Sequence, residues 1–129
     1  MKIFEECYTL SNGAKIPKMG LGTWFIPDET ISQAVKDAVK IGYRHFDTAQ
    51  AYGNERGVGE GIRTCGVPRE ELFVVSKVAA EHKTYEAAKA GIDETLKKMG
   101  LDYLDMMIIH SPQPWVEVNQ SENRYKEGN

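Results

Sequence analysis

The sequence lacks a long uninterrupted apolar run. Hydrophobic residues make up 41% of its 129 residues, but their runs are short, such as residues 106–109. A membrane-spanning helix needs about 20 consecutive apolar residues. Residues 1–6 turn acidic at once and lack the apolar core of a signal peptide. We therefore expect neither a membrane segment nor secretion, and a cytoplasmic location.

Cysteine is also scarce. The two cysteines, Cys7 and Cys65, lack the spacing of metal ligands. In a chain of this size they are more simply reduced thiols, although a disulfide between them is the alternative. The sequence therefore predicts no metal site.

A strong excess of one charge is absent too. The net charge of −3 argues against nucleic acid or an anionic membrane as a partner. No Ser-His-Asp set, P-loop or zinc motif is apparent. The glycine-rich segment 53–61 lacks the spacing of a dinucleotide-binding fingerprint, because Ile62 stands where the last glycine should be. We interpret its glycines as positions where a helix packs close to a sheet.

What the chain does contain is an alternation of strand-like and helix-like segments. A short hairpin is predicted over residues 7–17, around the Asn12-Gly13 turn. Apolar and β-branched runs then predict four strands, and helical periodicity predicts three helices between them. The predicted strands are 19–23, 44–48, 72–76 and 103–109, and the helices are 31–41, 54–64 and 85–99. This βαβαβαβ order implies an α/β fold with parallel strands and helices packed outside.

The ends of these helices also carry signals. Asp28 or Thr30 is expected to cap the first helix, and Thr84 the third. The middle helix is expected to be weak, because each of its three glycines costs about 1 kcal/mol relative to alanine. The polar segment 113–129 breaks the alternation, and no helix follows the last strand. We expect a single partial domain over residues 1–129, with the four strands within 19–112 and two open sheet edges.

Three of the predicted strands end on one ionisable residue. Asp47, Lys77 and His110 each follow an apolar run, and Tyr52 lies on the loop after Asp47. The C-terminal ends of parallel strands lie together on the face where such folds carry their sites. Taken singly, each residue would more often be a turn, surface or loop residue. Their coincidence at one face favours a functional site.

The chemistry that suits this group is protonation of a developing alkoxide. A free phenol titrates near pH ~10, and a nearby ammonium lowers the pKa of such a phenol. In this interpretation Tyr52 is the acid, Lys77 and Asp47 tune it, and His110 orients a carbonyl oxygen. None of these side chains carries hydride, so a reduced cofactor would have to supply it.

The same segments resemble the aldo-keto reductases. The matching motifs run in one unbroken order between residues 8 and 112. They are Gly-Leu-Gly-Thr-Trp at 20–24, Phe-Asp-Thr-Ala at 46–49, Tyr-Gly-Asn-Glu at 52–55, Ser-Lys at 76–77, Leu-Asp-Tyr-Leu-Asp at 101–105 and Ile-Ile-His-Ser-Pro at 108–112. The chain looks most similar to bacterial members grouped with 2,5-diketogluconate and glyoxal reductases. The resemblance implies the N-terminal half of a (β/α)8 TIM barrel, because a whole barrel takes about 250 residues.

The resemblance further implies NADPH-dependent reduction of aldehydes or ketones to alcohols, with NADH as an open alternative. Its implied catalytic residues are Asp47, Tyr52, Lys77 and His110. The implied cofactor contacts are Gly22, Thr23, Trp24 and Asp47, and the small-molecule carbonyl pocket comprises Trp24, Tyr52, His110 and Trp115. Ala79 and Ser111 stand where many relatives carry tryptophan, which implies a wider and more polar pocket.

Alternatives to a self-sufficient enzyme stay open. In the family, most contacts to the cofactor's phosphates and adenine come from the half of the barrel that this chain lacks. The chain is therefore expected to be a truncated reductase half that is inactive in isolation. It could instead pair with a separate C-terminal half or a second copy through its exposed strand edges, or serve as an interaction or regulatory subunit.

Overall fold

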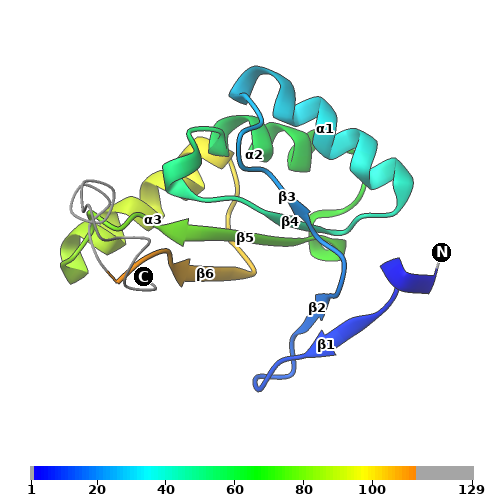
Figure 1. Ribbon diagram of the computed structural model, residues 1–129, viewed down its shortest axis with the longest axis horizontal. Coiled ribbons are helices and arrows are strands. Elements are labelled where there is room, and N and C mark those ends of the chain that lie inside the picture. Colours follow the sequence, from blue (N-terminus) through cyan, green and yellow to red (C-terminus); the bar gives the residue numbers. More distant parts are fainter. Residues whose placement is uncertain (1, 113–129) are drawn as a thin grey trace, which may run out of the picture.

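The structure, a computed structural model, describes residues 2–112, so Trp115 and the predicted polar segment 113–129 lie outside the described residues. A short 3-10 turn, η1 (Lys2–Phe4), leads into an antiparallel hairpin. The hairpin strands, β1 (Cys7–Thr9) and β2 (Lys15–Pro17), pair apart from the main sheet (Figure 1). The predicted hairpin is therefore confirmed. Cys7 and Cys65 are both free, which confirms the reduced thiols.

The main sheet has four strands, all parallel, in the order β3-β4-β5-β6. Their bounds are β3 (Leu21–Gly22), β4 (His45–Asp47), β5 (Phe73–Val78) and β6 (Met106–Ile109). The helices between them are α1 (Asp28–Ile41), α2 (Glu55–Thr64) and α3 (Tyr85–Met99), with short 3-10 turns η2 (Gln50–Tyr52) and η3 (Arg69–Glu71). Spatial order follows chain order, as expected of successive βα units. The predicted four parallel strands and three helices are confirmed.

The helix-facing side of the sheet holds the hydrophobic core. α2 packs against both α1 and α3, and the side chains between helices and sheet are closed to solvent. The fully buried members of this layer include Ile31, Val35, Phe46, Val58, Val74 and Met99. β5, one of the two inner strands of the described sheet, is buried along its whole length.

Several strand bounds differ from prediction. β5 runs to Val78 rather than ending at residue 76, so Lys77 lies within it. The larger differences are at the sheet's two edges. β3 is limited to two residues, and β6 begins at Met106 rather than at residue 103. Just before β6, side-chain hydrogen bonds supplement the main-chain pairing. The Arg69 guanidinium donates to the Tyr103 carbonyl at 3.0 Å, and the Asp105 carboxylate accepts the Val74 N–H at 2.8 Å. These bonds fix the approach to β6 together with the main-chain bond from the Asp105 N–H to the Val74 carbonyl at 3.0 Å.

The glycines of α2 allow close packing, but their partners are helices and not the sheet as predicted. A Cβ at Gly57 or Gly61 would overlap α1, at Asp28 and Val35 respectively, and a Cβ at Gly59 would overlap the main chain of Met99 in α3. Despite its glycines, α2 is a regular helix of 10 residues. Tertiary packing outweighs intrinsic propensity here.

The cap predicted for α1 is wrong, whereas that for α3 is confirmed. The N-cap of α1 is Pro27, with no side-chain cap bond. The Asp28 carboxylate instead accepts the Gly57 N–H of α2 at 2.7 Å, so it joins two helices rather than capping one. Thr84 does cap α3, since its hydroxyl accepts the Ala87 N–H at 3.1 Å.

Candidate active site

Lys77 lies at the centre of the predicted cluster. Val74 belongs to the core and Ser76 bonds to α2, so the period-two alternation of β5 turns Lys77 to the opposite face. The Lys77 ammonium donates to Asp47 Oδ2 at 2.7 Å, to the Thr48 carbonyl at 2.8 Å and to the Tyr52 hydroxyl at 3.3 Å. The residue is only 9% exposed. Three acceptors therefore stabilise a charge that has lost most of its water.

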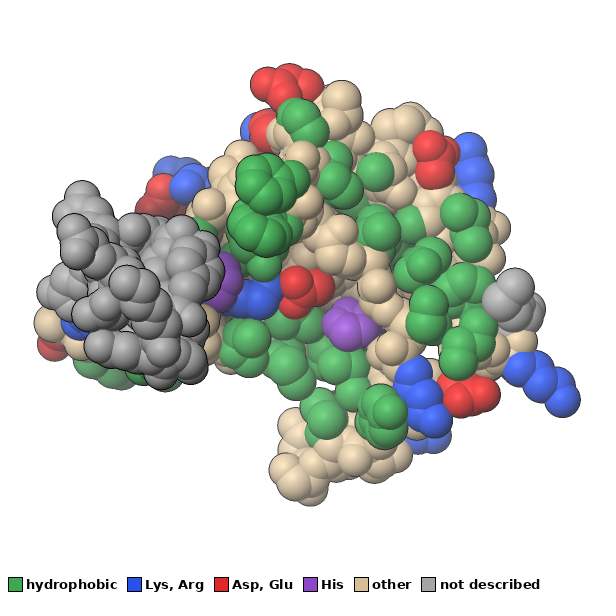
Figure 2. Space-filling view, in the orientation of Figure 1, with side chains coloured by type: hydrophobic (Ala, Val, Ile, Leu, Met, Phe, Trp, Pro, Cys, Tyr) green, Lys and Arg blue, Asp and Glu red, His purple; other side chains and the backbone are tan. Residues whose placement is uncertain are grey.

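Asp47 and Tyr52 reach Lys77 from the same connection. Asp47 is the last residue of β4, and Tyr52 is the last residue of η2 in the loop that follows. Gly53 then adopts a left-handed conformation with φ 70° and directs the chain into α2. Figure 2 shows acidic, basic and histidine side chains close together among hydrophobic ones near the middle of the viewed face.

His110 completes the group from the end of β6. Its ring meets the Tyr52 ring edge-on, with centroids 5.7 Å apart and an interplanar angle of 80°. Burial lowers the pKa of His110 below its usual value of 6.5, and the positive charge of Lys77 lowers it further, while Asp47 and Glu81 oppose the shift. The imidazole is therefore neutral at neutral pH and offers one N–H donor. The structure brings together all four residues predicted to be catalytic.

The residues predicted to bind cofactor and substrate have different environments. Gly22 ends β3 beside open space, because a Cβ there would meet no atom within 4 Å. Trp24 is 65% exposed, and its ring stacks on Tyr52 with centroids 6.3 Å apart. Thr23, in contrast, is fully buried, and its hydroxyl donates to the Asp47 carbonyl at 2.9 Å. Gly22 and Trp24 thus face solvent, whereas the Thr23 side chain supports Asp47.

Sequence reasoning assigned no role to three buried polar residues, Thr48, Asn54 and Glu55. Asn54 accepts the Thr48 hydroxyl at 3.0 Å and donates to the Thr23 carbonyl at 2.7 Å. The Glu55 carboxylate accepts the Ser76 hydroxyl at 2.6 Å. They lie within the motifs that carry the family resemblance, but none is an ionisable residue at the end of a predicted strand, the signal that indicated the site. A polar residue at the start of a helix is ordinarily interpreted as a cap.

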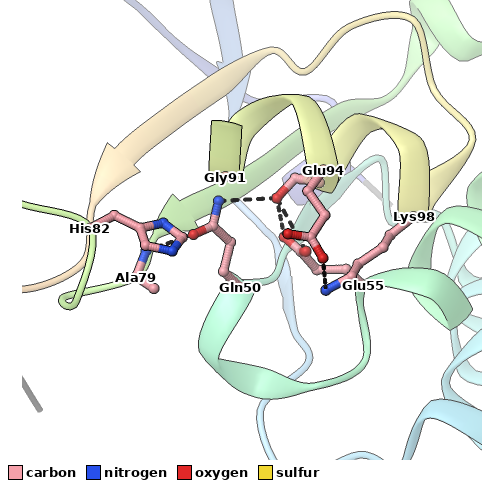
Figure 3. A pocket seen from close by; sticks show the side chains of 8 residues that line it. Gln50, Glu55, Ala79, His82, Gly91, Glu94 and Lys98 are labelled. Atoms are coloured by element: carbon pink, nitrogen blue, oxygen red, sulfur yellow. Dashed lines mark hydrogen bonds and ion pairs between the residues drawn. The ribbon is translucent and has the colours of Figure 1, made fainter. Parts of the chain in front are cut away.

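A polar cavity of about 210 Å³ lies between the loop that carries Tyr52 and α3 (Figure 3). Gln50 spans it: its side-chain carbonyl accepts the Ala79 N–H at 2.8 Å, and its amide donates to the Thr95 hydroxyl at 3.2 Å. The same Thr95 hydroxyl bonds to the Glu55 carboxylate at 3.1 Å. These bonds tie the Tyr52 loop to the helix layer.

Residues 2–112 contain neither a membrane-spanning helix nor a cluster of metal-ligating side chains. None of the helices there is both long and apolar enough to cross a membrane. No group of three or more His, Cys, Asp or Glu side chains in that range could hold a metal ion.

The comparisons with known proteins agree on one family. Residues 18–127 match the model of the Aldo/keto reductase family. A 9,11-endoperoxide prostaglandin H2 reductase from Trypanosoma cruzi is 47% identical over 109 residues, which is 83% of this chain and 38% of that protein. A glycerol 2-dehydrogenase (NADP(+)) from Saccharomyces cerevisiae is 47% identical over 105 residues, covering 81% of this chain and 33% of that protein. The chain belongs to the aldo/keto reductase family.

Solved structures confirm the half-barrel fold. An aldo/keto reductase from Brucella melitensis superposes with a TM-score of 0.82 at 41% identity, covering 84% of this chain and 42% of that one. A Bombyx mori aldo-keto reductase in complex with NADP gives a TM-score of 0.77 at 38% identity, covering 83% of this chain and 38% of that one. The chain thus spans less than half the length of these relatives.

Proposed function

We propose that this chain carries the proton-donating half of a carbonyl reductase that uses NADPH to reduce aldehydes or ketones to alcohols. The observation that carries the proposal is the contact between the Lys77 ammonium and both Asp47 and the Tyr52 hydroxyl. Relatives named as reductases or dehydrogenases, one of them with NADP(+) in its name, support it. The narrower resemblance to 2,5-diketogluconate and glyoxal reductases stays a prediction.

In this proposal the four residues have separate tasks. Tyr52 delivers a proton to the oxygen of the carbonyl as that oxygen gains negative charge. Lys77, oriented by Asp47, stabilises the negative charge left on the phenol oxygen. Neutral His110 donates a hydrogen bond to the same carbonyl oxygen and holds it near the Tyr52 hydroxyl.

A nicotinamide group fits the open end of β3. Gly22 leaves room for close approach, and the exposed Trp24 ring offers a flat apolar surface beside Tyr52. NADPH, when bound, would supply the hydride that the carbonyl carbon accepts. Gly22, Trp24 and Asp47 would hold the nicotinamide end, and Thr23 would act through the Asp47 main chain. Preference for NADPH over NADH rests on the relatives alone.

The test is NADPH oxidation with methylglyoxal, measured for a protein that joins this chain to the remaining strands of a barrel. Tyr52→Phe removes only the hydroxyl, and we expect turnover to fall at least about 100-fold, the scale of general acid catalysis. Tyr8→Phe is the matched control, because Tyr8 is 62% exposed on the hairpin. Unchanged turnover in Tyr52→Phe would show that Tyr52 is not the proton donor.

A second candidate function is a half-barrel that binds a partner chain to complete the barrel. It is favoured by β6, which pairs on one side only within the described residues and leaves Ile109 77% exposed. Under this candidate the chain alone binds NADPH weakly or not at all and self-associates or captures a complementary half. Fluorescence titration with NADPH and sedimentation at micromolar concentration test it, and a monomer that binds NADPH tightly would exclude it.

A further inference from the structure

We propose that Asn54 is a positioning residue of the site, which holds Lys77 through Thr48 and holds Trp24 through the main chain on either side of it. The inference rests on the proposed function, because it assigns Lys77 and Trp24 the roles given above. Neither Asn54 nor Thr48 contacts the reacting atoms in this proposal. Both act through residues that do.

The first arm runs from Asn54 to Lys77. The Thr48 hydroxyl donates to Asn54 Oδ1 at 3.0 Å, and the Thr48 carbonyl accepts the Lys77 ammonium at 2.8 Å. The Thr48 N–H also donates to the Val75 carbonyl at 2.9 Å. Thr48 is therefore fixed at its side chain, N–H and carbonyl, and its carbonyl offers Lys77 a rigid acceptor. Such an acceptor holds the ammonium between Asp47 and Tyr52 without adding another charge.

The second arm runs from Asn54 to Trp24. The Asn54 amide donates to the Thr23 carbonyl at 2.7 Å and to the Ile26 carbonyl at 3.0 Å. These two carbonyls flank Trp24 and Phe25, and Phe25 has a φ of 63°, which is strained for a side chain of its size. A main-chain bond from the Ile26 N–H to the Thr23 carbonyl at 3.2 Å closes the same turn. The Asn54 amide adds a second, side-chain bridge across it, and Trp24 in this turn stacks on both Phe25 and Tyr52.

The burial of Asn54 distinguishes it from an ordinary helix cap. Asn54 is only 1% exposed, and although it occupies the N-cap position of α2 its side chain makes no cap bond. An asparagine that capped α2 would point its oxygen at the first turn of the helix. Here the side chain points into the junction of the β3–α1 and β4–α2 loops. All its bonds go to segments that carry residues of the site.

The experiment measures how fast each lysine of the whole chain is acetylated by a trace amine-reactive ester, with peptide mass spectrometry as the readout. Lys40, whose side chain is 77% exposed, is the internal reference. Thr48→Val removes the hydroxyl that anchors the first arm, and we expect labelling of Lys77 to rise about fivefold, the scale of one lost hydrogen bond. Thr48→Ser keeps the hydroxyl and should restore slow labelling.

The matched control is Thr95→Val. Thr95 is as buried as Thr48, and its hydroxyl bonds to Gln50 and Glu55. The variant therefore removes a comparable buried hydroxyl that bonds neither to Lys77 nor to its three acceptors. Gln50 keeps its bond to the Ala79 N–H, so the Tyr52 loop stays attached. We expect no change in Lys77 labelling. An increase equal to that in Thr48→Val would mean general loosening and would overturn the first arm.

The second arm is measured on Trp24 in a Trp115→Phe background, where it is the single tryptophan. Asn54→Ala should lower the fluorescence anisotropy of Trp24 and also raise Lys77 labelling, whereas Thr48→Val should leave the anisotropy unchanged. If Asn54→Ala does not fold, Thr48→Val and Thr48→Ser still decide the first arm. Lys77 that stays protected in every folded variant would overturn the inference and leave the proposed function intact. Rapid labelling of Lys77 in the unaltered chain would contradict both.

Discussion

The two faces of the sheet differ in what they carry. The helix-covered face presents Phe46 and Val74, which are fully buried among apolar side chains. The opposite face presents Asp47 and Lys77, whose charged groups are hydrogen-bonded to each other. Both faces belong to the same two strands, β4 and β5, in which successive side chains point to opposite sides of the sheet. The first face gains stability from burial of apolar surface. The second face carries charged groups that are partly removed from water, and these must be paired with one another to offset the lost hydration. Two neighbouring residues in one strand can therefore serve stability and chemistry separately.

The largest expected effect contrasts two isoleucines. Ile31→Ala empties a site in the helix-facing layer where the side chain has no exposure, and we expect a loss of about 4 kcal/mol in the free energy of unfolding. Ile109→Ala, on the 77% exposed edge strand, should change it by less than about 0.5 kcal/mol. Urea denaturation measures both. A comparable loss at Ile109 would show that β6 is covered in solution.

A smaller effect is expected from glycine substitutions. Gly59→Ala places a methyl group against the Met99 main chain, and we expect a loss of about 2 kcal/mol although alanine favours helices. Gly22→Ala, where a Cβ meets open space, is the control and should cost little in stability. A stabilised Gly59→Ala variant would contradict the backbone contact between α2 and α3. Thermal and urea unfolding of the two variants show whether each substitution raises or lowers the free energy of unfolding.

The smallest effect concerns His110. Its pKa is lowered in the folded chain by burial and by Lys77, so the unfolded chain binds more protons between that lowered value and 6.5. Stability therefore falls as the pH drops through 6.5 and levels off below the folded pKa. His110→Gln should remove this part of the pH dependence. Urea midpoints of both proteins across this range test it, and identical slopes would exclude a lowered pKa for His110.

The sequence predicted the order and type of the elements well, although not the bounds of every strand, because those signals are local. Apolar runs located the strands, and parallel topology then implied that Asp47, Tyr52, Lys77 and His110 converge. The long-range bonds were not predictable. The Asp105 carboxylate accepts the Val74 N–H beside a main-chain bond between the same two residues, and nothing in its sequence neighbourhood indicates that partner.

Asn54 shows the same limit within the site. A polar residue before a helix indicates a cap, but its bonds go to Thr23, Ile26 and Thr48. Two of those residues lie 28 and 31 positions away in the chain. Local propensity contains no information on such contacts, so the supporting residues of a site become visible only when the fold is known.

The glycines of α2 have a consequence for how this chain tolerates change. Gly57 and Gly61 face α1 while Gly59 faces α3, so the helix fits its neighbours in one rotational setting. Insertion or deletion of one residue within α2 would turn the following residues by about 100° and drive larger side chains into both neighbours. Length variation in this part of the molecule should therefore be confined to loops. The segment from Tyr52 to Glu55 is thereby held in place by a helix whose rotation and axial position are both fixed by its packing against α1 and α3.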